Sequence, residues 1–336
     1  MSNPLNRDTQ HTTPAMTANA RLYFLVARTP IHVGCGDSLG AIDKPVRRHV
    51  VTTHPQVPNT AIKSRLRGAA KGHWAGGLGE NQLRALFGAE EGAGAAAGTG
   101  ILSPQDANLL LLPVACWAGG AAWVTSPSVL LRLQRLVLGC QLTQPPPAVI
   151  PKLPNDVSAF VVPGSPLLSR YAHAQPAHYL VLHEEVLHAQ VQTDWLPWAK
   201  WLREHAMAGE PKDWADDFER RVALVPDAAL DHLCEVATDV RTRNRIGDDG
   251  IAEDNALWRE ECVPEDSVFA GVVSALRVPE HEALYTESQA LAIVQTCEVQ
   301  VGGRASIGCG WASFRPVLTP ATPVAPTEKV IADGTA

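Results

Sequence analysis

Asp43 lies in a glycine-containing segment, His32 to Arg48, in which basic residues follow it closely. A second basic stretch, Lys63 to Lys71, comes next, and no acidic residue lies between Arg48 and Lys71. Cations in this arrangement can hold phosphates. A lone carboxylate can ligate Mg²⁺, which usually takes only one or two carboxylates and fills its other positions with phosphate oxygens and water. These residue types indicate phosphodiester cleavage, with Asp43 as the candidate catalytic residue and as a ligand of Mg²⁺ or another divalent cation.

The second basic stretch has the spacing of one helical face. Lys63, Arg67 and Lys71 recur at intervals of four, so they share one side of a helix predicted over about 59–71. The side chain of Asn59 or Thr60 is placed to cap that helix. Most cationic stripes of this kind are simply solvated. This one adjoins the candidate catalytic segment, and we therefore expect it to contact phosphates.

Two further segments could contact phosphates. Arg241, Arg243 and Arg245 alternate with other residues, which places them on one side of a predicted strand. A glycine-rich loop near the end of the chain would let backbone amides approach a phosphate closely. It is not a dinucleotide-binding fingerprint, since it does not join an early strand to a helix. The candidate phosphate contacts are Lys44, Arg47, Arg48, Lys63, Arg67, Lys71, Arg241, Arg243, Arg245, Gly302, Gly303, Arg304, Gly308 and Gly310.

Composition limits the class of protein. The chain has 336 residues, 46% of them hydrophobic, which is enough for a sizeable core. Its net charge of −7, taken alone, argues against nucleic-acid binding. The acidic residues are concentrated in 204–219 and 248–266, away from the cations, so the net charge does not exclude a basic surface. No apolar run approaches about 18 residues and no signal peptide is evident, so we expect a cytoplasmic protein without a membrane partner. The seven cysteines are scattered, which predicts neither a disulfide framework nor a zinc site, and Cys309 is expected to be a small buried filler.

The hydrophobic patterns predict a mixed fold. Apolar runs and helical spacing predict strands at 22–27, 106–114, 117–125 and 291–301 and helices at about 59–71 and 127–138. The order strand, helix, strand, strand, helix is typical of an α+β sandwich of ferredoxin type rather than of a doubly wound sheet.

Changes of composition divide the chain. Residues 1–20 and 317–336 are expected to be flexible tails. Prolines from Pro145 onward mark a break, and 143–222 is interpreted as an insertion, partly extended and partly helical, in which Trp195, Trp198 and Trp201 form a packed face. Residues 223–267 contain two extended runs around a turn at 247–250, which predicts a long hairpin. The main unit then comprises 21–142 and 268–316.

Taken in order, the segments resemble a known family. The blocks that carry the resemblance are Thr29-Pro-Ile-His32-Val-Gly, Leu39-Gly-Ala-Ile-Asp43-Lys-Pro-Val-Arg-Arg48, Pro58-Asn-Thr-Ala-Ile-Lys63-Ser-Arg-Leu-Arg67, Leu86-Phe-Gly88, Asp106-Ala-Asn-Leu-Leu-Leu-Leu-Pro-Val114, Trp123-Val-Thr-Ser-Pro127, Arg241-Thr-Arg-Asn-Arg-Ile246, Leu257-Trp-Arg-Glu-Glu261 and Gly302-Gly-Arg-Ala-Ser-Ile-Gly-Cys-Gly-Trp311. Their order and spacing are similar to those of the RAMP proteins of CRISPR effector complexes, in particular the backbone subunits of the type III-B (Cmr) complex.

The resemblance implies a fold, partners and site residues. It implies a palm of ferredoxin-like, RRM type, a protruding hairpin thumb, and several copies stacked along a guide RNA (crRNA) with other Cmr subunits. Each copy would cut the complementary target RNA once, giving cuts at regular intervals. The family's catalytic aspartate falls on Asp43, a histidine of the same active-site loop falls on His32, and a thumb glutamate falls on Glu260 or Glu261. For His32, proton transfer and a structural hydrogen bond to the backbone are both open.

Three functions are consistent with the sequence. The first is a guide-RNA-binding backbone subunit with endoribonuclease activity. The second is a scaffold of the same fold that binds RNA without cutting it, which differs only in the competence of Asp43. The third is a small-molecule enzyme that uses the glycine-rich loop for a phosphorylated ligand. We favour the first, because the basic residues are spread over distant segments rather than gathered around one loop.

Overall fold

The computed structural model describes residues 19–36, 38, 40–89, 98–140, 142–154, 158–170, 178–247 and 252–317. The predicted tails at 1–20 and 317–336 fall almost wholly outside these residues, as do most of the turn at 247–250 and residues 90–97 of the glycine- and alanine-rich loop. Within the described residues, no helix is long and apolar enough to cross a membrane.

The first sheet is built on β1 (Ala20–Ala27). β1 pairs antiparallel with β13 (Val268–Ala275) on one side and with β15 (Trp311–Pro316) on the other. Next to β13 lies β4 (Ala107–Cys116), and next to β15 lies β14 (Cys297–Gln300), both also antiparallel. The short strands β2 (Gln56–Val57) and β3 (Leu102–Pro104) pair with β4 and β13.

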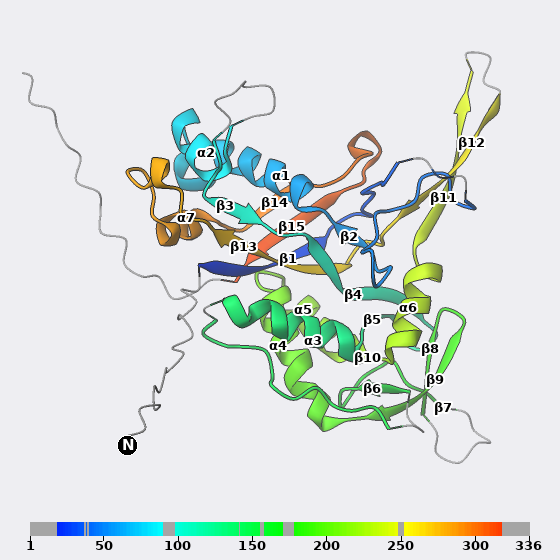
Figure 1. Cartoon of the computed structure of the whole chain (residues 1–336). Helices are drawn as coiled ribbons and strands as arrows, with labels where there is room; N and C mark the ends of the chain where they lie inside the picture. Colours follow the sequence, from blue (N-terminus) through cyan, green and yellow to red (C-terminus); the bar gives the residue numbers. More distant parts are fainter. Residues whose placement is uncertain are drawn as a thin grey trace, which may run out of the picture.

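Helices cover both faces of this sheet (Figure 1). On one face lie α1 (Asn59–Gly72), α2 (Glu80–Phe87) and α7 (Glu287–Ile293). On the other lie α3 (Pro127–Leu136) and α4 (Leu196–Ala206). Because it is covered on both sides, β1 is apolar and buried along almost its whole length, as expected from the run at 22–27. Leu25 of β1 lies opposite Phe269 on one neighbouring strand and Phe314 on the other.

A second group of strands closes into a six-stranded ring. β4 passes from the first sheet into this ring, where it pairs with β5 (Gly120–Thr125). The ring continues through β10 (Val222–Leu224), β6 (Ala159–Val161), β9 (Glu185–Val191) and β8 (His178–Leu182), and β8 returns to β4 through Leu182 and Cys116. β7 (Ser169–Arg170) pairs with β8 outside the ring. The segment 143–222, predicted as an insertion, thus supplies three of the six ring strands, β6, β8 and β9.

The helix predicted within 143–222 is confirmed, and so is its packing role. Trp195, Trp198 and Trp201 are buried, and each indole N–H donates to a backbone carbonyl, respectively that of Val222, Val149 and Gln144. These tryptophans are therefore structural and are not placed to stack on bases. α5 (Lys212–Arg221) packs against α4, and short 3₁₀ helices lie at Trp74–Gly76, Val137–Gly139, Thr193–Trp195, Pro279–His281 and Ala305–Ile307.

A two-stranded hairpin projects from the molecule (Figure 1). It consists of β11 (Asp239–Ile246) and β12 (Ala252–Cys262), which form a sheet of their own with a bulge between Asn244 and Ile246. α6 (Asp227–Val236) comes immediately before it. The predicted hairpin is confirmed, while the first part of the segment 223–267 is occupied by β10 and α6.

Three local predictions are corrected. The strand predicted at 291–301 begins only at Cys297, because Thr286 and Gln289 form a capping box that starts α7. The strand predicted at 117–125 begins at Gly120, after a turn, and pairs in the ring rather than beside β1. Neither Asn59 nor Thr60 caps α1 with its side chain.

The cap of α1 comes from a distant residue instead. The carboxylate of Asp106, just before β4, accepts a 2.7 Å hydrogen bond from the amide of Asn59, the first residue of the helix. A carboxylate is favourable at this position because the helix N-terminus carries a partial positive charge.

Candidate functional site

Asp43 is fixed at the base of the hairpin. Its Oδ2 accepts a 2.7 Å hydrogen bond from the amide of Arg259 in β12, and its side chain is exposed. The next residue pairs with the same strand, since the Lys44 amide donates to the Arg259 carbonyl and the Glu261 amide donates to the Lys44 carbonyl, both at 3.0 Å. Among the described residues Oδ1 has no partner. One carboxylate oxygen therefore holds the loop on the strand, and the other is open to a ligand.

His32 joins the same site from the preceding segment. Its ring is buried, and Nδ1 lies 2.7 Å from the carbonyl oxygen of Glu261. Nδ1 must carry a proton, because a carbonyl can only accept, and Nε2 faces Glu260, whose Oε1 is 4.0 Å away. The His32 carbonyl accepts from the Gly303 amide at 2.9 Å. His32 is thus bonded both to the hairpin base and to the glycine-rich loop.

Glu260 is completely buried, and its carboxylate accepts hydrogen bonds from two arginines. Its Oε2 accepts a 2.6 Å hydrogen bond from Nε of Arg243, and its Oε1 accepts from Nε of Arg304. Burial raises the pKa of this carboxyl, but the hydrogen bonds and charges of Arg243 and Arg304, with a contribution from His32, outweigh it and hold the pKa below its usual range. Glu260 is therefore an ionised carboxylate engaged by partners from two other segments.

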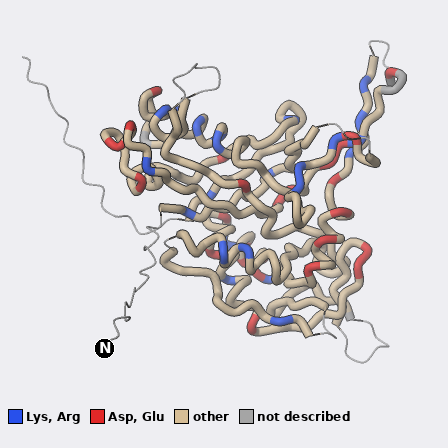
Figure 2. The backbone as a smooth tube through the Cα atoms, in the orientation of Figure 1, with Lys and Arg blue, Asp and Glu red and all other residues tan. Residues whose placement is uncertain are grey.

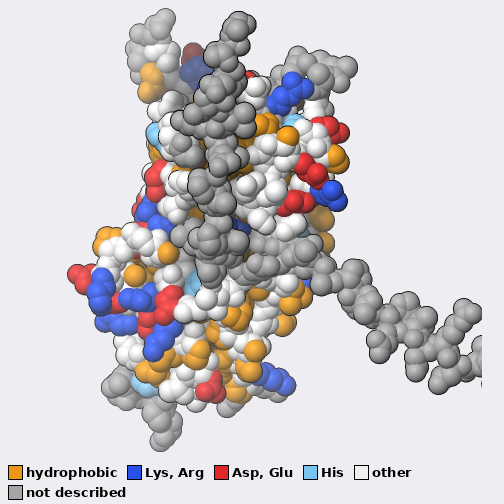
Figure 3. Space-filling model, turned by 90° about the vertical axis from the view of Figure 1, so that its left-hand side faces the viewer, with side chains coloured by type: hydrophobic (Ala, Val, Ile, Leu, Met, Phe, Trp, Pro, Cys, Tyr) orange, Lys and Arg blue, Asp and Glu red, His pale blue; other side chains and the backbone are white. Residues whose placement is uncertain are grey.

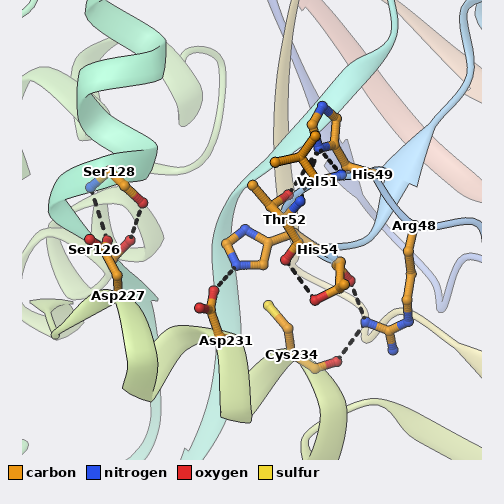
Figure 4. A network of polar contacts seen from close by, with 11 residues as sticks. Arg48, His49, Val51, Thr52, His54, Ser126, Ser128, Asp227, Asp231 and Cys234 are labelled. Carbon is orange, nitrogen blue, oxygen red and sulfur yellow. Dashed lines mark hydrogen bonds and ion pairs between the residues drawn. The ribbon is translucent and has the colours of Figure 1, made fainter.

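Glu261 is also buried and engaged, on the other side of β12. Its Oε2 accepts from the amide of Val46 at 2.9 Å, and its Oε1 lies 2.5 Å from Nη2 of Arg48. Nη1 of Arg48 donates in addition to the carbonyls of Thr53 and Cys234, at 2.9 and 3.0 Å (Figure 4). Arg48 therefore ties the loop, the hairpin and the end of α6 together, whereas the neighbouring Arg47 is exposed.

A second polar group holds α6, and sequence reasoning missed it. Buried His54 lies with Nε2 2.7 Å from Oδ1 of Asp231 on α6 (Figure 4). Asp227, at the start of the same helix, accepts a 3.0 Å hydrogen bond from the amide of Ser128. Burial raises the pKa of Asp227, but hydrogen bonds from Ser126 and Ser128 bring it below its ordinary value. α6 leads directly into the hairpin, so these contacts help to set where the hairpin starts. No local sequence motif could have predicted this contact, because Asp231 lies 177 residues after His54.

The predicted cationic stripe on α1 is only partly a free surface. Arg67 turns toward α2, where Nη1 donates to the Gly88 carbonyl at 2.6 Å and Nη2 donates to Glu80 at 2.7 Å. Lys63 is half-buried, and burial together with the charge of Arg67 lowers its pKa. Lys71 is exposed. The 3.6-residue period places these residues on neighbouring positions of the helix, but it does not reveal that Arg67 has partners of its own.

The alternation along β11 is confirmed by the strand register for Arg241 and Arg243, whereas Arg245 lies in the bulge between Asn244 and Ile246. In Figure 2 basic positions lie along the hairpin together with acidic ones. Each of the three arginines has an acidic partner: Arg241 lies 2.5 Å from Asp239, Arg243 bonds to Glu260, and Arg245 lies 3.3 Å from Glu253. Lys44 contributes from the loop, with Nζ 5.6 Å from the ring centre of Trp258. The sequence reasoning did not assign a role to Trp258.

The glycine-rich loop packs on the His32 segment. The amides of Gly303, Gly308 and Gly310 donate to the carbonyls of His32, Ala305 and Pro30, so these three amides are not available to a phosphate. Gly302 and Gly310 have positive φ, and a Cβ on either would lie 2.2 or 2.3 Å from a backbone oxygen. Their role in the structure is close backbone approach. The side chain of Arg304 is the part of this loop that turns toward Glu260.

The acidic stretch 204–219 does not form a separate acidic face. Glu210 pairs with Arg28 and Arg315, Asp216 pairs with Arg203 and Lys212, and Asp217 pairs with Arg220 and Arg221. On the uncovered part of the face drawn in Figure 3, acidic and basic side chains likewise lie side by side. Glu210, Asp216 and Asp217 of this stretch are thus paired with basic side chains.

The described residues contain no group of three His, Cys, Asp or Glu side chains that could hold a metal ion. Glu260 and Glu261 are already neutralised by arginines, which leaves the open oxygen of Asp43 as one carboxylate ligand. The donor set does not fit a resident metal centre. It is compatible with an ion whose other ligands are phosphate oxygens and water.

The chain is similar to proteins of known family. The model of the RAMP superfamily matches residues 24–313. The CRISPR system Cmr endoribonuclease Cmr4 of Pyrococcus furiosus is 27% identical over 303 residues, which cover 87% of this chain and 94% of that protein. The crystal structure of oligomeric Cmr4 from Pyrococcus furiosus has a TM-score of 0.62 at 23% identity, covering 88% of this chain and 97% of that one. A chain of the type III-B Cmr-beta complex bound to cognate target RNA has a TM-score of 0.62 at 17% identity, covering 89% and 97%.

Proposed function

This chain belongs to the RAMP superfamily, and we propose that it is the guide-RNA-binding backbone subunit of a type III-B CRISPR effector complex and an endoribonuclease that cuts the bound target RNA. The relative of known activity is an endoribonuclease of the Cmr system, and the alignment covers most of both chains. A structural neighbour belongs to a Cmr complex with target RNA, and another is an oligomer. The partners would be the guide, the complementary target, further copies of this chain and other Cmr subunits in the cytoplasm.

The architecture supports a palm and a thumb. The strand order β15-β1-β13-β4, antiparallel throughout, with α1 between β1 and β4 and α7 between β13 and β15, has the connectivity of a ferredoxin-like β-α-β-β-α-β unit. We propose this unit as the palm and the β11–β12 hairpin as the thumb. The six-stranded ring is then an addition to the palm, made largely from residues 159–224.

The observation that carries the proposal is the convergence of three distant segments at the hairpin base. Asp43 bonds to β12, His32 bonds to both β12 and the glycine-rich loop, and Arg304 reaches from that loop to Glu260. This brings an open carboxylate, an imidazole and several guanidinium groups to one place. Such a set can orient a 2′-hydroxyl or a water and can stabilise the charge that develops on a cleaved phosphodiester.

Within this proposal Asp43 is the catalytic residue. Its open oxygen can accept a proton from, or orient, the attacking hydroxyl, or it can ligate a divalent ion carried in with the RNA. His32 has its Nδ1 committed to a carbonyl, so its Nε2 is the nitrogen that could exchange a proton. The two glutamates are buried with partners, which suits a role in holding the site. Arg47 and Lys71, exposed and without ion pairs among the described residues, are the most available phosphate contacts.

The proposal is tested with the assembled ribonucleoprotein. The chain would be co-expressed with its neighbouring Cmr subunits and a guide, purified, and given a labelled complementary RNA with and without EDTA. We expect a ladder of cuts at a constant interval, with one cut for each copy of this chain, and loss of cutting in EDTA that Mg²⁺ or Mn²⁺ restores. Guide binding without cleavage of the target would exclude the endoribonuclease and support the scaffold that binds RNA without cutting it. Absence of guide binding would contradict both functions.

A further inference from the structure

We propose that Arg243 and Arg304 form a clamp for one phosphate of the bound RNA, and that buried Glu260 is the positioning residue that holds the two guanidinium groups in place. The inference rests on the proposed function, which it deepens by assigning the thumb glutamate a positional role. It concerns a single carboxylate shared by two arginines, one from β11 and one from the glycine-rich loop.

The hydrogen bonds leave the outer ends of both arginines open. Each arginine donates its Nε–H to a different oxygen of Glu260, and the Nη1 and Nη2 groups of both have no partner among the described residues. The Arg243 and Arg304 side chains are 26% and 33% exposed, whereas Glu260 is fully buried. An arginine held by its Nε edge presents its remaining N–H groups as a fork, the geometry that binds phosphate oxygens in pairs.

The charge balance favours an anion. One carboxylate and two guanidinium groups leave one net positive charge, which is held partly out of water. Arg241 and Arg245 of β11 each have an acidic partner of their own, whereas Arg243 and Arg304 share Glu260. In the described part of the chain, no further acidic side chain pairs with Arg243 or Arg304. A phosphate bound by the two guanidinium groups would neutralise this remaining positive charge.

The backbone around Arg304 shows that its position is maintained against strain. Arg304 has φ of +66°, in the left-handed region that favours glycine, although glycines stand at 302, 303 and 308 in the same loop. Such a conformation persists only where the surrounding contacts hold it, and here the Arg304 carbonyl accepts from the amides of Ile307 and Cys309 while the Arg304 side chain pairs with Glu260. The side chain is directed at the hairpin rather than at solvent.

The clamp adjoins the candidate catalytic residue. Asp43 accepts its hydrogen bond from Arg259, the residue directly before Glu260 in β12, and His32 lies 4.0 Å from Glu260. A phosphate held by Arg243 and Arg304 is therefore placed at the hairpin base, where the proposed cut occurs. We assign it as the scissile phosphate of the target strand.

The first test measures RNA binding and does not depend on cleavage. A short target RNA, complementary to the guide across one cut site, would be titrated in EDTA onto the guide-loaded complex at several salt concentrations, for the wild type, for Arg243→Gln, for Arg304→Gln and for Arg277→Gln as a control. Arg277 is an exposed arginine with an acidic partner outside the site. We expect the slope of log affinity against log salt to fall by about 0.7 in either clamp variant, which corresponds to one phosphate contact, and to stay unchanged in the control. An unchanged slope in both clamp variants would overturn the clamp.

The second test uses the assembled complex and a target with Rp or Sp phosphorothioate at the cut linkage. If the arginines hold a non-bridging oxygen, one diastereomer is cut about tenfold more slowly than the native linkage by the wild type, and this difference disappears in the clamp variants. An identical thio effect in wild type and variants would also overturn the clamp. A wild-type complex that binds guide but does not cut would contradict the proposed activity alone, since the salt-slope test still decides the clamp.

Glu260→Gln separates positioning from catalysis. The variant should lower the cleavage rate while leaving the shape of the pH–rate profile unchanged, whereas loss of one limb of that profile would identify Glu260 as a general base and contradict a positioning role. If Arg304→Gln fails to assemble because it leaves the carboxylate unpaired, the double variant Glu260→Gln/Arg304→Gln removes that charge. The same two measurements then apply to it.

Discussion

The Oδ2 of Asp43 accepts a 2.7 Å hydrogen bond from the backbone amide of Arg259, a residue 216 positions later in the chain. This bond places the candidate catalytic carboxylate on the strand that carries Glu260 and Glu261. It also gives Asp43 two separable properties, a structural acceptor at one oxygen and a free charge at the other. A substitution can remove the second while preserving the first.

Arg47 and Arg48 are adjacent but should respond in opposite ways to substitution. Arg48→Met removes the partner of buried Glu261 and two hydrogen bonds to backbone carbonyls, so we expect a loss of about 3–5 kcal/mol in the free energy of unfolding. Arg47→Met should change that free energy by less than about 0.5 kcal/mol, because Arg47 is exposed and its side chain has no partner among the described residues.

RNA binding by the two variants distinguishes the residues further. Arg47→Met should weaken binding of RNA and reduce the salt slope by about 0.7, the value for one phosphate contact on a single strand. Urea unfolding and filter binding on the same preparations provide the check. Equal unfolding free energies for the two variants would contradict the structural assignment of Arg48.

Glu260 should make stability depend on pH in the acid range. Its folded pKa is lowered, so its contribution is fully present above the unfolded value, about 4.3 for a glutamate, and is lost as the pH falls through the folded value. Glu260→Gln should cost about 1.5–3 kcal/mol at pH 7, and its unfolding free energy should fall less than that of the wild type between pH 5 and pH 3. Glu253→Gln, which removes an exposed partner of Arg245, serves as the control with a cost below about 1 kcal/mol. Parallel acid dependence in wild type and Glu260→Gln would exclude the predicted linkage.

The sequence predicted local features of this site better than it predicted partners. The strand at 22–27, the helix at about 59–71, the hairpin and the alternation of Arg241 and Arg243 follow from periodicity, which is a property of neighbouring residues. The contacts of Arg67 could not be predicted from helical periodicity, because its partners Glu80 and Gly88 lie outside α1.

Contacts between distant residues account for the sequence predictions that were wrong. Within the ring, β8 from the segment 143–222 pairs with β4 and β10 pairs with β5, and the cap of α1 comes from Asp106 rather than from Asn59 or Thr60. The glycines were expected to present amides to a phosphate, yet the amides of Gly303 and Gly310 bond to the His32 segment. Each of these outcomes depends on a contact between residues far apart in the sequence, which no local pattern contains.

Two neighbouring glycines test the packing of the glycine-rich loop. Gly302→Ala would place a Cβ 2.2 Å from the carbonyl oxygen of His32 at a φ of +76°, so it must displace the loop. Gly303→Ala meets only the His32 ring at 3.9 Å, an ordinary contact. We expect Gly302→Ala to lower the melting temperature by several degrees, consistent with a loss of at least 1–2 kcal/mol, and Gly303→Ala to change it little. Equal melting temperatures would show that the loop does not pack on His32 as described.

The cysteines should differ sharply in reactivity. Cys35 is exposed, whereas Cys262 and Cys309 are buried side by side, and burial together with Cys309 raises the pKa of the Cys262 thiol to about 12. Alkylation by iodoacetamide at pH 8 without denaturant, followed by peptide mass spectrometry, should label Cys35 first and leave Cys262 and Cys309 unmodified until urea is added. Early labelling of Cys309 would contradict its role as a buried filler of the loop.

The central claim, that the free charge of Asp43 drives cleavage, is tested most directly by Asp43→Asn in the assembled complex. Asparagine keeps an oxygen that can accept from the Arg259 amide, so the loop stays on β12 while the charge is lost. Asp213→Asn, an exposed change on α5 outside the site, is the matched control. We predict unchanged guide binding and assembly for both, a single-turnover cleavage rate reduced at least about 10²-fold in Asp43→Asn, and a normal rate in Asp213→Asn. A normal cleavage rate in Asp43→Asn would contradict the claim.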